Sequence, residues 1–464
     1  MQLIILFAFI LFGLEGCGLF DGEVVETGTQ YNEVIPYDPD TGEKIDPGDP
    51  VTPEEPVDLV LKSGKYCSFT AATDTTAYFI RNDSTVDGAP VGGPRTRMYT
   101  RGSNNYGLRT GNPDKAEDSD VPFYMALFPL GVSIPTQIQA GTTHMGFIDT
   151  EDDNQTYPSW ANLEMFGINL VEGDYMGLTL TSPMTGEAYK ISTGHRHTVV
   201  LTKQNRVIMW GDNSYGQSGW PGDNFADVSN TPVFAGTPDE GVFTNVLDVS
   251  AGSYNTCLIR GPLNESGDVW CKGRSTVGQS GFDDYANQTA STGSEVWHQL
   301  PITDAVQVSA GADHACALTK QGKVKCWGRN VNGALGVSTS IVPEYTHIPQ
   351  EIPNFRAKFI WSTFYSTFAI TANGELYSWG DDTYGVLGHG TINGHTSTPT
   401  KVEGLENVTD VSGNWYTVLI RTGNEDEARY YGIGNNQKYQ ISNTSDDYFN
   451  TPVEIIVPVL PDYM

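Results

Sequence analysis

The cysteines are the residues of this sequence whose spacing points most directly to a chemical role. Two pairs, Cys257 with Cys271 and Cys316 with Cys326, occupy the same two positions of a repeated unit, and the other copies hold no cysteine at either position. The turn 320–322 places Cys316 opposite Cys326 on antiparallel strands, with Cβ atoms roughly 4.5–5.5 Å apart. Two disulfides are therefore predicted, each worth about 3 kcal/mol in the chain-entropy account. A zinc site, the alternative, would need four convergent ligands, which two separate hairpins do not supply.

Three of the histidines share another position of the unit, where a catalytic role would be the alternative to a structural one. They are His144, His197 and His314. A catalytic residue is needed once, so repetition of the side chain predicts a structural hydrogen bond to the backbone in each copy. Cys67 falls at the same position and is interpreted as an unpaired buried thiol, with a bridge to an unmodified Cys17 as the alternative.

No sequence motif of a known catalytic centre is present. The chain has no Gly-x-Ser-x-Gly elbow, Walker loop or His-Glu-x-x-His. The 56 acidic residues are too many for one pair to be singled out as acid and base. Tryptophans that precede glycine at Trp210, Trp327 and Trp379 are interpreted as core anchors rather than sugar platforms. We expect no catalysis, no metal and no cofactor; a hydrolase assembled from several repeats is the alternative.

The composition describes an acidic, turn-rich chain. Of the 464 residues 51 are glycine and only 18% are charged, which excludes a coiled coil and disfavours a helical bundle. With 56 acidic and 26 basic side chains the net charge is −30, so a phosphate backbone would be repelled. No nucleic-acid partner is expected.

From Val57 onward one pattern recurs, with a period of about 58 residues. A β-branched strand ends at a glycine, a short loop and a second apolar strand follow, and a third strand ends in an aromatic-Gly pair and a polar turn. The first glycine position falls at Gly64, Gly141, Gly194, Gly252, Gly311, Thr363 and Gly413, and the second at 102, 167, 211, 273, 328, 380 and 434. Short strands repeated at this period predict a β-propeller or a solenoid.

These copies resemble the regulator of chromosome condensation repeat, whose motif is similar to Gly-x-x-His-Thr…Leu-Thr-x-x-Gly-x-Val…Trp-Gly-x-Asn-x-x-Gly-Gln. The resemblance implies an all-β fold, a single seven-bladed β-propeller over residues 57–464. Its blades are expected near 57–120, 132–180, 186–222, 242–290, 301–340, 352–392 and 402–445, with a closing strand at 451–458. We expect Pro452–Val457 to complete the first blade beside Asp58–Lys62, which would close the ring.

The N-terminus predicts export. Leu3–Leu14 is an apolar run too short to cross a bilayer and of the right length for a signal peptide. The next residues end in Gly16-Cys17 and resemble a bacterial lipobox, so residues 1–16 are a predicted signal and Cys17 the lipidated residue; an ordinary cleaved signal is the alternative. Residues 17–56 form an acidic, proline-rich tether. The D-x-D-x-G at 38–42 lacks the rest of a calcium loop. We expect a lipoprotein of the bacterial cell envelope, in the outer membrane.

The residues after each first glycine are expected to ring one end of the propeller, because they link two antiparallel strands in every blade. Turns after the second glycine, including Asp212, Arg274, Arg329 and Asp381, are expected at the same end. Tyrosine, tryptophan and arginine dominate protein-binding hot spots. The predicted binding face is Tyr66, Arg196, Tyr254, Asp313, Phe364, Tyr365 and Trp415. The β-lactamase-inhibitor members of the family resemble precedents for binding a protein this way. We expect a monomer that binds a protein partner; a carbohydrate or surface-polymer binder is the alternative.

Overall fold

The fold is all-β. A computed structural model describes strands at 70–71, 76–83, 95–102 and 119–125, and residues 133–142, 144–151, 162–168, 175–180, 188–219, 229–283, 293–423, 429–442 and 444–455. Among these residues the regular structure is β, apart from a 3-10 turn at Thr383–Gly385. No helix in the described part of the chain has the length and apolar character that a membrane crossing needs.

The described strands form seven four-stranded antiparallel sheets and a two-stranded one, β13 (Gly236–Thr237) with β14 (Gly241–Val242). In each four-stranded sheet the strands follow chain order. The first two sheets are β1 (Thr70–Ala71), β2 (Thr76–Asp83), β3 (Arg95–Gly102), β4 (Ser119–Met125) and β5 (Ser133–Ala140), β6 (His144–Glu151), β7 (Asn162–Ile168), β8 (Tyr175–Leu180).

Five further sheets follow, and most of their side chains are described. They are β9 (Ala188–Thr193), β10 (His197–Thr202), β11 (Val207–Gly211), β12 (Ser229–Phe234); β15 (Val246–Ala251), β16 (Asn255–Arg260), β17 (Asp268–Arg274), β18 (Gly293–Gln299); β19 (Ala305–Ala310), β20 (His314–Thr319), β21 (Lys323–Arg329), β22 (Tyr345–Arg356); β23 (Phe359–Ser362), β24 (Ser366–Ile370), β25 (Leu376–Asp381), β26 (His395–Lys401); and β27 (Val408–Asn414), β28 (Thr417–Thr422), β29 (Arg429–Asn435), β30 (Tyr448–Glu454).

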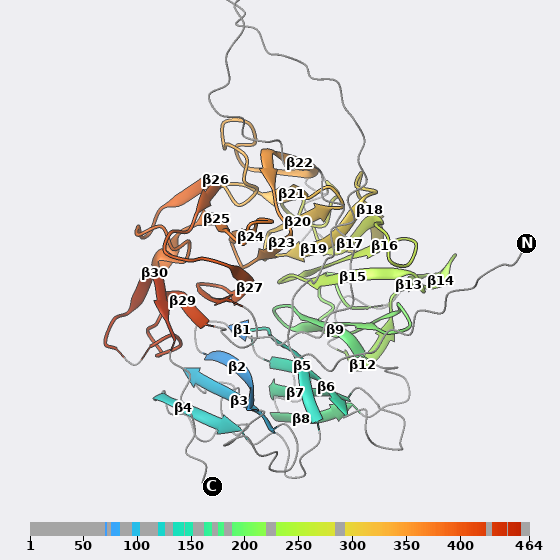
Figure 1. Cartoon of the computed structure of the whole chain (residues 1–464). Helices are drawn as coiled ribbons and strands as arrows, with labels where there is room; N and C mark the ends of the chain where they lie inside the picture. Colours follow the sequence, from blue (N-terminus) through green and yellow to red (C-terminus); the bar gives the residue numbers. More distant parts are fainter. Residues whose placement is uncertain are drawn as a thin grey trace, which may run out of the picture.

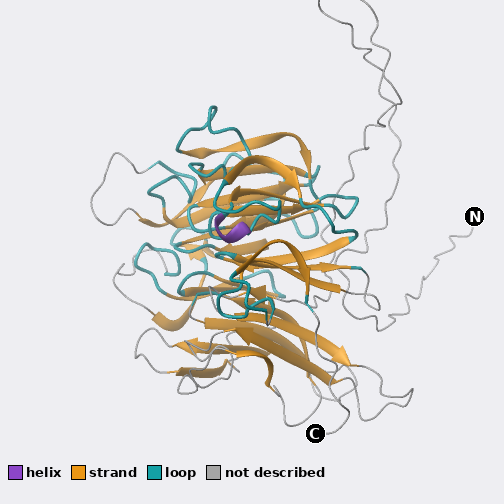
Figure 2. Cartoon of the chain, turned by 90° about the vertical axis from the view of Figure 1, so that its left-hand side faces the viewer, coloured by secondary structure: helices purple, strands orange, loops and turns teal. Residues whose placement is uncertain are grey.

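The sheets are arranged around a common centre as the blades of a β-propeller (Figure 1). The first strand of each sheet lies innermost, and consecutive first strands contact each other from β5 to β27, while β1 contacts both β5 and β27. Turned by 90°, the strands of successive sheets lie one above another with loops bordering them (Figure 2). The core sits between neighbouring sheets: Leu318 and Val324 of one sheet share a buried cluster with Ile360 and Trp379 of the next.

Glycines at the ends of the inner strands let neighbouring blades approach closely. A Cβ added to Gly194 would lie 2.2 Å from the carbonyl oxygen of Gly252, and one on Gly252 or Gly311 would lie 2.3 Å from the corresponding oxygen of the next blade. Real Cβ atoms do not come this close to an oxygen. The distance between blades therefore requires glycine at these three positions, whereas Thr363 and Asn414 occupy the equivalent position in the last two sheets.

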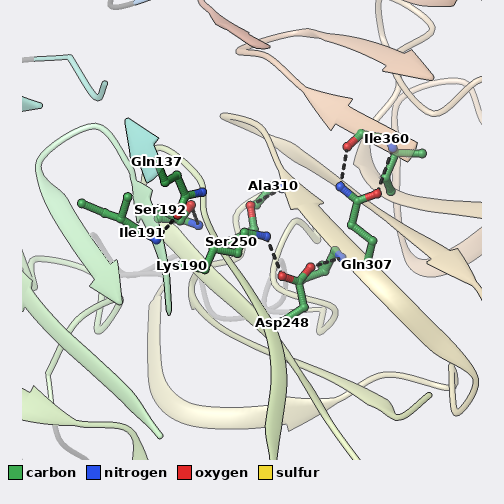
Figure 3. A network of polar contacts seen from close by, with 11 residues as sticks. Gln137, Lys190, Ile191, Ser192, Asp248, Ser250, Gln307, Ala310 and Ile360 are labelled. Atoms are coloured by element: carbon green, nitrogen blue, oxygen red, sulfur yellow. Dashed lines mark hydrogen bonds and ion pairs between the residues drawn. The ribbon is translucent and has the colours of Figure 1, made fainter. Parts of the chain in front are cut away.

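Polar side chains join the inner strands where they do not pair as a sheet (Figure 3). Each accepts a backbone N–H of the following blade, so buried donors that lie outside any sheet ladder are satisfied. The contacts are Ile191 N to Gln137 Oε1 at 2.8 Å, Ala251 N to Ser192 Oγ, Val308 N to Asp248 Oδ2, Ala310 N to Ser250 Oγ and Ile360 N to Gln307 Oε1 at 2.9 Å, and Ser362 N to Ser309 Oγ at 2.7 Å. Lys190 Nζ also donates to Asp248 Oδ1 at 2.5 Å.

The repeated histidines also form hydrogen bonds between neighbouring blades. The Nε2 atoms lie 2.9–3.0 Å from threonine hydroxyls of the next blade, in the pairs His144–Thr198, His197–Thr256 and His314–Thr367. Thr367 donates its own proton to the Ala334 carbonyl at 3.0 Å, so His314 must be the donor and carries its proton on Nε2. The structural interpretation agrees with these contacts, in which the partner is a side-chain hydroxyl of the next blade.

The predicted disulfides are confirmed. Cys257 is bonded to Cys271 and Cys316 to Cys326, with Cα atoms 4.1 and 4.0 Å apart. Each pair is directly opposite in the register of its second and third strands. The lipidation prediction for Cys17 and the thiol prediction for Cys67 lie outside the described residues.

The prediction that the C-terminal strand completes the first blade is wrong. β30, which contains Pro452, pairs with β29 as the outer strand of its own sheet, and Asp58–Lys62 lies outside the described residues. Segments of this kind complete the sheet that precedes them, as β12 does with Pro232. For the same reason the outer strands β12, β18, β22, β26 and β30 begin beyond the blade ends expected from the repeats.

The last repeat is shifted by one residue from its sequence alignment. Thr417 pairs with Gly434 as His314 pairs with Gly328, so Thr417 and not Tyr416 stands at the histidine position. Asn414 therefore takes the place of the repeat glycine that the alignment gave to Gly413. Its side-chain Nδ2 reaches the Ala140 carbonyl at 3.3 Å, a contact across 274 residues of sequence.

Replacing Cys316 and Cys326 with Val and Met, the pair that stands at these positions as Val199 and Met209 in the β9–β12 sheet, should lower the free energy of unfolding by about 3 kcal/mol. The apolar contact is retained, so the loss measures the cross-link. Urea unfolding without reductant tests this. Adding dithiothreitol should destabilise the wild type and change this variant less; an equal effect on both would contradict the prediction.

Stability should fall below pH 6.5 because of the buried histidines. Burial lowers the pKa of His314 from 6.5 to about 4. Between these pH values the unfolded chain binds a proton at His314 and the folded chain does not. The contribution of the neutral histidine to the free energy of unfolding is therefore complete above pH 6.5 and is lost as the pH falls toward 4. Each histidine contributes at most about 1.4 kcal/mol per pH unit. H314N, which copies Asn255 of the β15–β18 sheet, should show a shallower slope in urea unfolding between pH 6.5 and 4. An unchanged slope would exclude this histidine.

Candidate functional site

Two sets of loops meet at one end of the described blades. The backbone N–H after each second glycine donates to the carbonyl of the second loop residue after the first glycine position. These bonds are Asp212 to Arg196, Arg274 to Tyr254 and Arg329 to Asp313 at 2.8 Å, Asp381 to Tyr365 at 3.1 Å and Asn435 to Tyr416 at 2.7 Å. Both groups of loop residues therefore share one surface, which we call the loop face.

The structure places six of the seven predicted site residues on the loop face. Arg196 is exposed, and Asp313 is buried at 8% exposure. The four aromatic members are partly buried: Tyr254, Phe364, Tyr365 and Trp415. Tyr66 lies outside the described residues. Half-burial leaves each aromatic ring held by its neighbours with one part in contact with solvent.

One aromatic group spans the last two blades. Phe364 stacks on Trp415 with ring centroids 3.9 Å apart and meets Tyr365 edge-on at 4.5 Å. Trp415 contacts Tyr416 at 6.1 Å, and Tyr416 contacts Tyr384 at 5.4 Å. Because these rings come from three loops and pack on one another, they form a preformed apolar surface.

A second aromatic group lies on the blades that begin with β9 and β15. Tyr254 lies 5.3 Å from His195 and 5.2 Å from Tyr215 between ring centroids. The guanidinium of Arg274 stands 5.6 Å from both tyrosine rings, within the range of a cation–π contact. His195 is also fixed from the preceding blade, since Thr142 Oγ1 lies 2.7 Å from its Nδ1.

Asp313 connects the two aromatic groups. Its Oδ1 lies 3.8 Å from Arg274 Nη1, and its Oδ2 accepts from Arg329 Nη1 at 3.3 Å. Arg329 in turn lies 5.7 Å from the ring of Tyr365. The loop face thus carries one carboxylate between two arginines, with an aromatic group beyond each arginine.

Burial raises the pKa of Tyr254, and the neighbouring Tyr215 and Asp212 raise it further. Burial also raises the pKa of Tyr365. Burial lowers the pKa of His195, and the nearby charge of Arg196 lowers it further. Both tyrosines therefore keep their hydroxyl protons at neutral pH and offer hydrogen-bond donors.

A narrow cavity of about 60 Å³ runs between the inner strands and is lined by Lys190, Ser192, Ser250, Gln307 and their neighbours. Its polar groups are largely used by the bonds between blades. Among the described residues no group of three or more His, Cys, Asp or Glu side chains could hold a metal ion.

Sequence reasoning missed three tyrosines of the loop face. Tyr416 was not predicted because the last repeat is shifted by one residue. Ser412 and Ser309 occupy the same register position, so aligning these two serines would have placed Tyr416 on the loop face. Tyr215 and Tyr384 stand just before the glycines of the polar turns, where the repeat motif alone does not indicate a surface role.

The comparisons with known proteins agree with this fold. A family model described as the RCC1-like domain matches residues 170–462. The ultraviolet-B receptor UVR8 of Arabidopsis thaliana is 30% identical over 204 residues, which cover 43% of this chain and 43% of the receptor. Protein pim1 of Schizosaccharomyces pombe is 25% identical over 231 residues, 47% of this chain and 41% of pim1. The chain thus spans less than half the length of these curated relatives.

Two solved structures show the same architecture. Prp20p of Saccharomyces cerevisiae has a TM-score of 0.58 at 16% identity, covering 75% of this chain and 80% of Prp20p. Human WBSCR16 has a TM-score of 0.57 at 19% identity, covering 75% and 84%. At these identities the likeness concerns the fold alone. Since the family model spans more than half of the chain, the resemblance of its repeats is confirmed, and the chain belongs to the RCC1-like domain family.

Proposed function

We propose that this chain is an exported, lipid-anchored propeller of seven blades whose loop face binds a protein partner without catalysing a reaction. The observation that carries the proposal is the set of packed aromatic and arginine side chains at one end. Tyrosine, tryptophan and arginine in preformed, partly desolvated positions are the residues that supply most binding energy in protein interfaces. Prp20p, a structural neighbour, was studied for its binding to Gsp1p and histones.

The seven-blade ring is supported by the contacts of the first sheet. β1 lies beside β5 on one side and β27 on the other (Figure 1). The bond from Asn414 to Ala140 also links the last blade with the second. A closed ring needs no further copy to cover an open edge, which fits a monomer.

Export and anchoring are supported by residues 1–17 and by the disulfides, since disulfides persist mainly in oxidising compartments. We place the protein in the bacterial cell envelope, in the outer membrane, attached only through its lipid. Nucleic acid is not a partner in this proposal, because the charge of −30 opposes it.

Cys17→Ala should move the protein from the membrane fraction to the soluble periplasmic or medium fraction, because the residue that accepts lipid is gone. Metabolic labelling with a palmitate analogue, followed by fractionation, measures this. Cys67→Ala is the control and should stay labelled and membrane-bound. Equal labelling of C17A and wild type would contradict the lipid-anchor proposal.

Tyr254→Ala, Tyr365→Ala and Trp415→Ala combined should abolish capture of the native partner from cell envelopes, because three anchors of the loop face are removed. The matched control is Arg206→Ala, Leu263→Ala and Arg356→Ala, at the opposite ends of the strands. Affinity capture with mass spectrometry compares them, and circular dichroism checks the fold. Undiminished capture by the loop-face variant would reject the assignment, and competition by sugar would favour a carbohydrate binder.

A further inference from the structure

The two arginines around Asp313 hold more hydrogen-bonding capacity than Asp313 uses. Each guanidinium carries five N–H donors, and the carboxylate contacts one nitrogen of each at 3.8 and 3.3 Å. The side chains of Arg274 and Arg329 remain 30% and 41% exposed, whereas that of Asp313 is 11% exposed. Donors therefore face solvent above a carboxylate that lies deeper.

Aromatic rings hold both guanidiniums in place. Arg274 lies against Tyr215 and Tyr254, and Arg329 against Tyr365. An arginine fixed in this way loses little side-chain entropy when it binds, and its planar fork matches a carboxylate.

Two other carboxylates of the loop face, Asp212 and Asp381, already accept hydrogen bonds from neighbouring groups. Asp212 accepts the backbone N–H of Ser214 at 2.8 Å. Asp381 accepts that of Thr383 at 2.8 Å and the side-chain amide of Asn332 at 2.6 Å. They fix the turns and leave the arginines available.

We propose that Arg274 and Arg329 together bind one Asp or Glu side chain of the protein partner, with Tyr254 and Tyr365 contacting the apolar residues beside it. The inference rests on the proposed function of the loop face and names the chemistry of its partner. Asp313 already neutralises part of the arginine charge, so a singly charged carboxylate is favoured over a doubly charged phosphate or a run of sulfates. The chain's charge of −30 also disfavours a strongly acidic ligand, so one acidic residue in an apolar segment fits best.

The test uses the full-length protein and two pools of synthetic twelve-residue peptides. One pool has a single central Asp or Glu between randomised apolar residues, and the matched pool has Asn or Gln there. We expect wild type to enrich the acidic pool, and R274Q/R329Q to bind its enriched peptides about tenfold more weakly or worse. R206Q/R356Q, which removes the same charge at the opposite ends of the strands, should bind them as wild type does.

R329Q alone provides a second variant, because this more exposed side chain can be changed with less risk to the fold. Equal enrichment of the two pools, no enrichment of the acidic pool, or unchanged binding by R274Q/R329Q and R329Q would overturn the inference. So would a preference for dextran sulfate over the acidic peptides.

Capture of the native partner separates this inference from the proposed function. Loss of the partner with Y254A/Y365A/W415A but not with R274Q/R329Q would keep the loop face and overturn the carboxylate site. Retention of the partner by both variants would overturn the proposed function itself.

Discussion

The close approach of neighbouring inner strands is the constraint on which the rest of this propeller depends. At Gly194, Gly252 and Gly311 the next blade's carbonyl oxygen would lie 2.2–2.3 Å from any added Cβ. Blades this close cannot be separated by side chains at those points, so serine, glutamine and aspartate just upstream must accept the backbone N–H groups of the next strand. These bonds help to position the inner strands β9, β15, β19 and β23, and the loops that follow these strands are positioned with them.

A second contact between blades, at the residue before the second glycine, is made by different side chains in different sheets. Trp327 and Trp379 precede the second glycine of their blades and donate indole N–H groups to the Gln279 and Ala334 carbonyls at 3.0 Å. Lys272 stands at this position in the β15–β18 sheet, is fully buried and donates to the Gly219 carbonyl at 2.5 Å. It lies 5.1 Å from the Trp297 ring. In these three sheets the position holds a donor to the preceding blade, and either an indole or an ammonium group can supply it, whereas Ile433 fills the position in the β27–β30 sheet with apolar packing.

Local patterns in the sequence predicted what local geometry determines, and failed where pairing between distant segments decides. The disulfides follow from hairpin register, and the loop face follows from the repeat, so both were predictable. The place of β30 depends on which distant partner it pairs with, and periodicity does not distinguish the outer strand of one blade from that of another. In the last repeat Gly413 was aligned with the repeat glycine because it is itself a glycine, although the register places Asn414 at that position.

The charge of the chain and the charge of the loop face act over different distances. A net charge of −30 produces a field that is screened beyond about 10 Å at ordinary ionic strength. Hydrogen bonds from a guanidinium act at contact distance and gain strength when water is excluded. A partner that covers the packed rings beside Arg274 and Arg329 would supply such an environment. In this proposal the arginines bind an acidic side chain strongly only after the aromatic groups have made contact with the partner and excluded water. This explains why the aromatic groups and the arginines lie at the same end of the propeller.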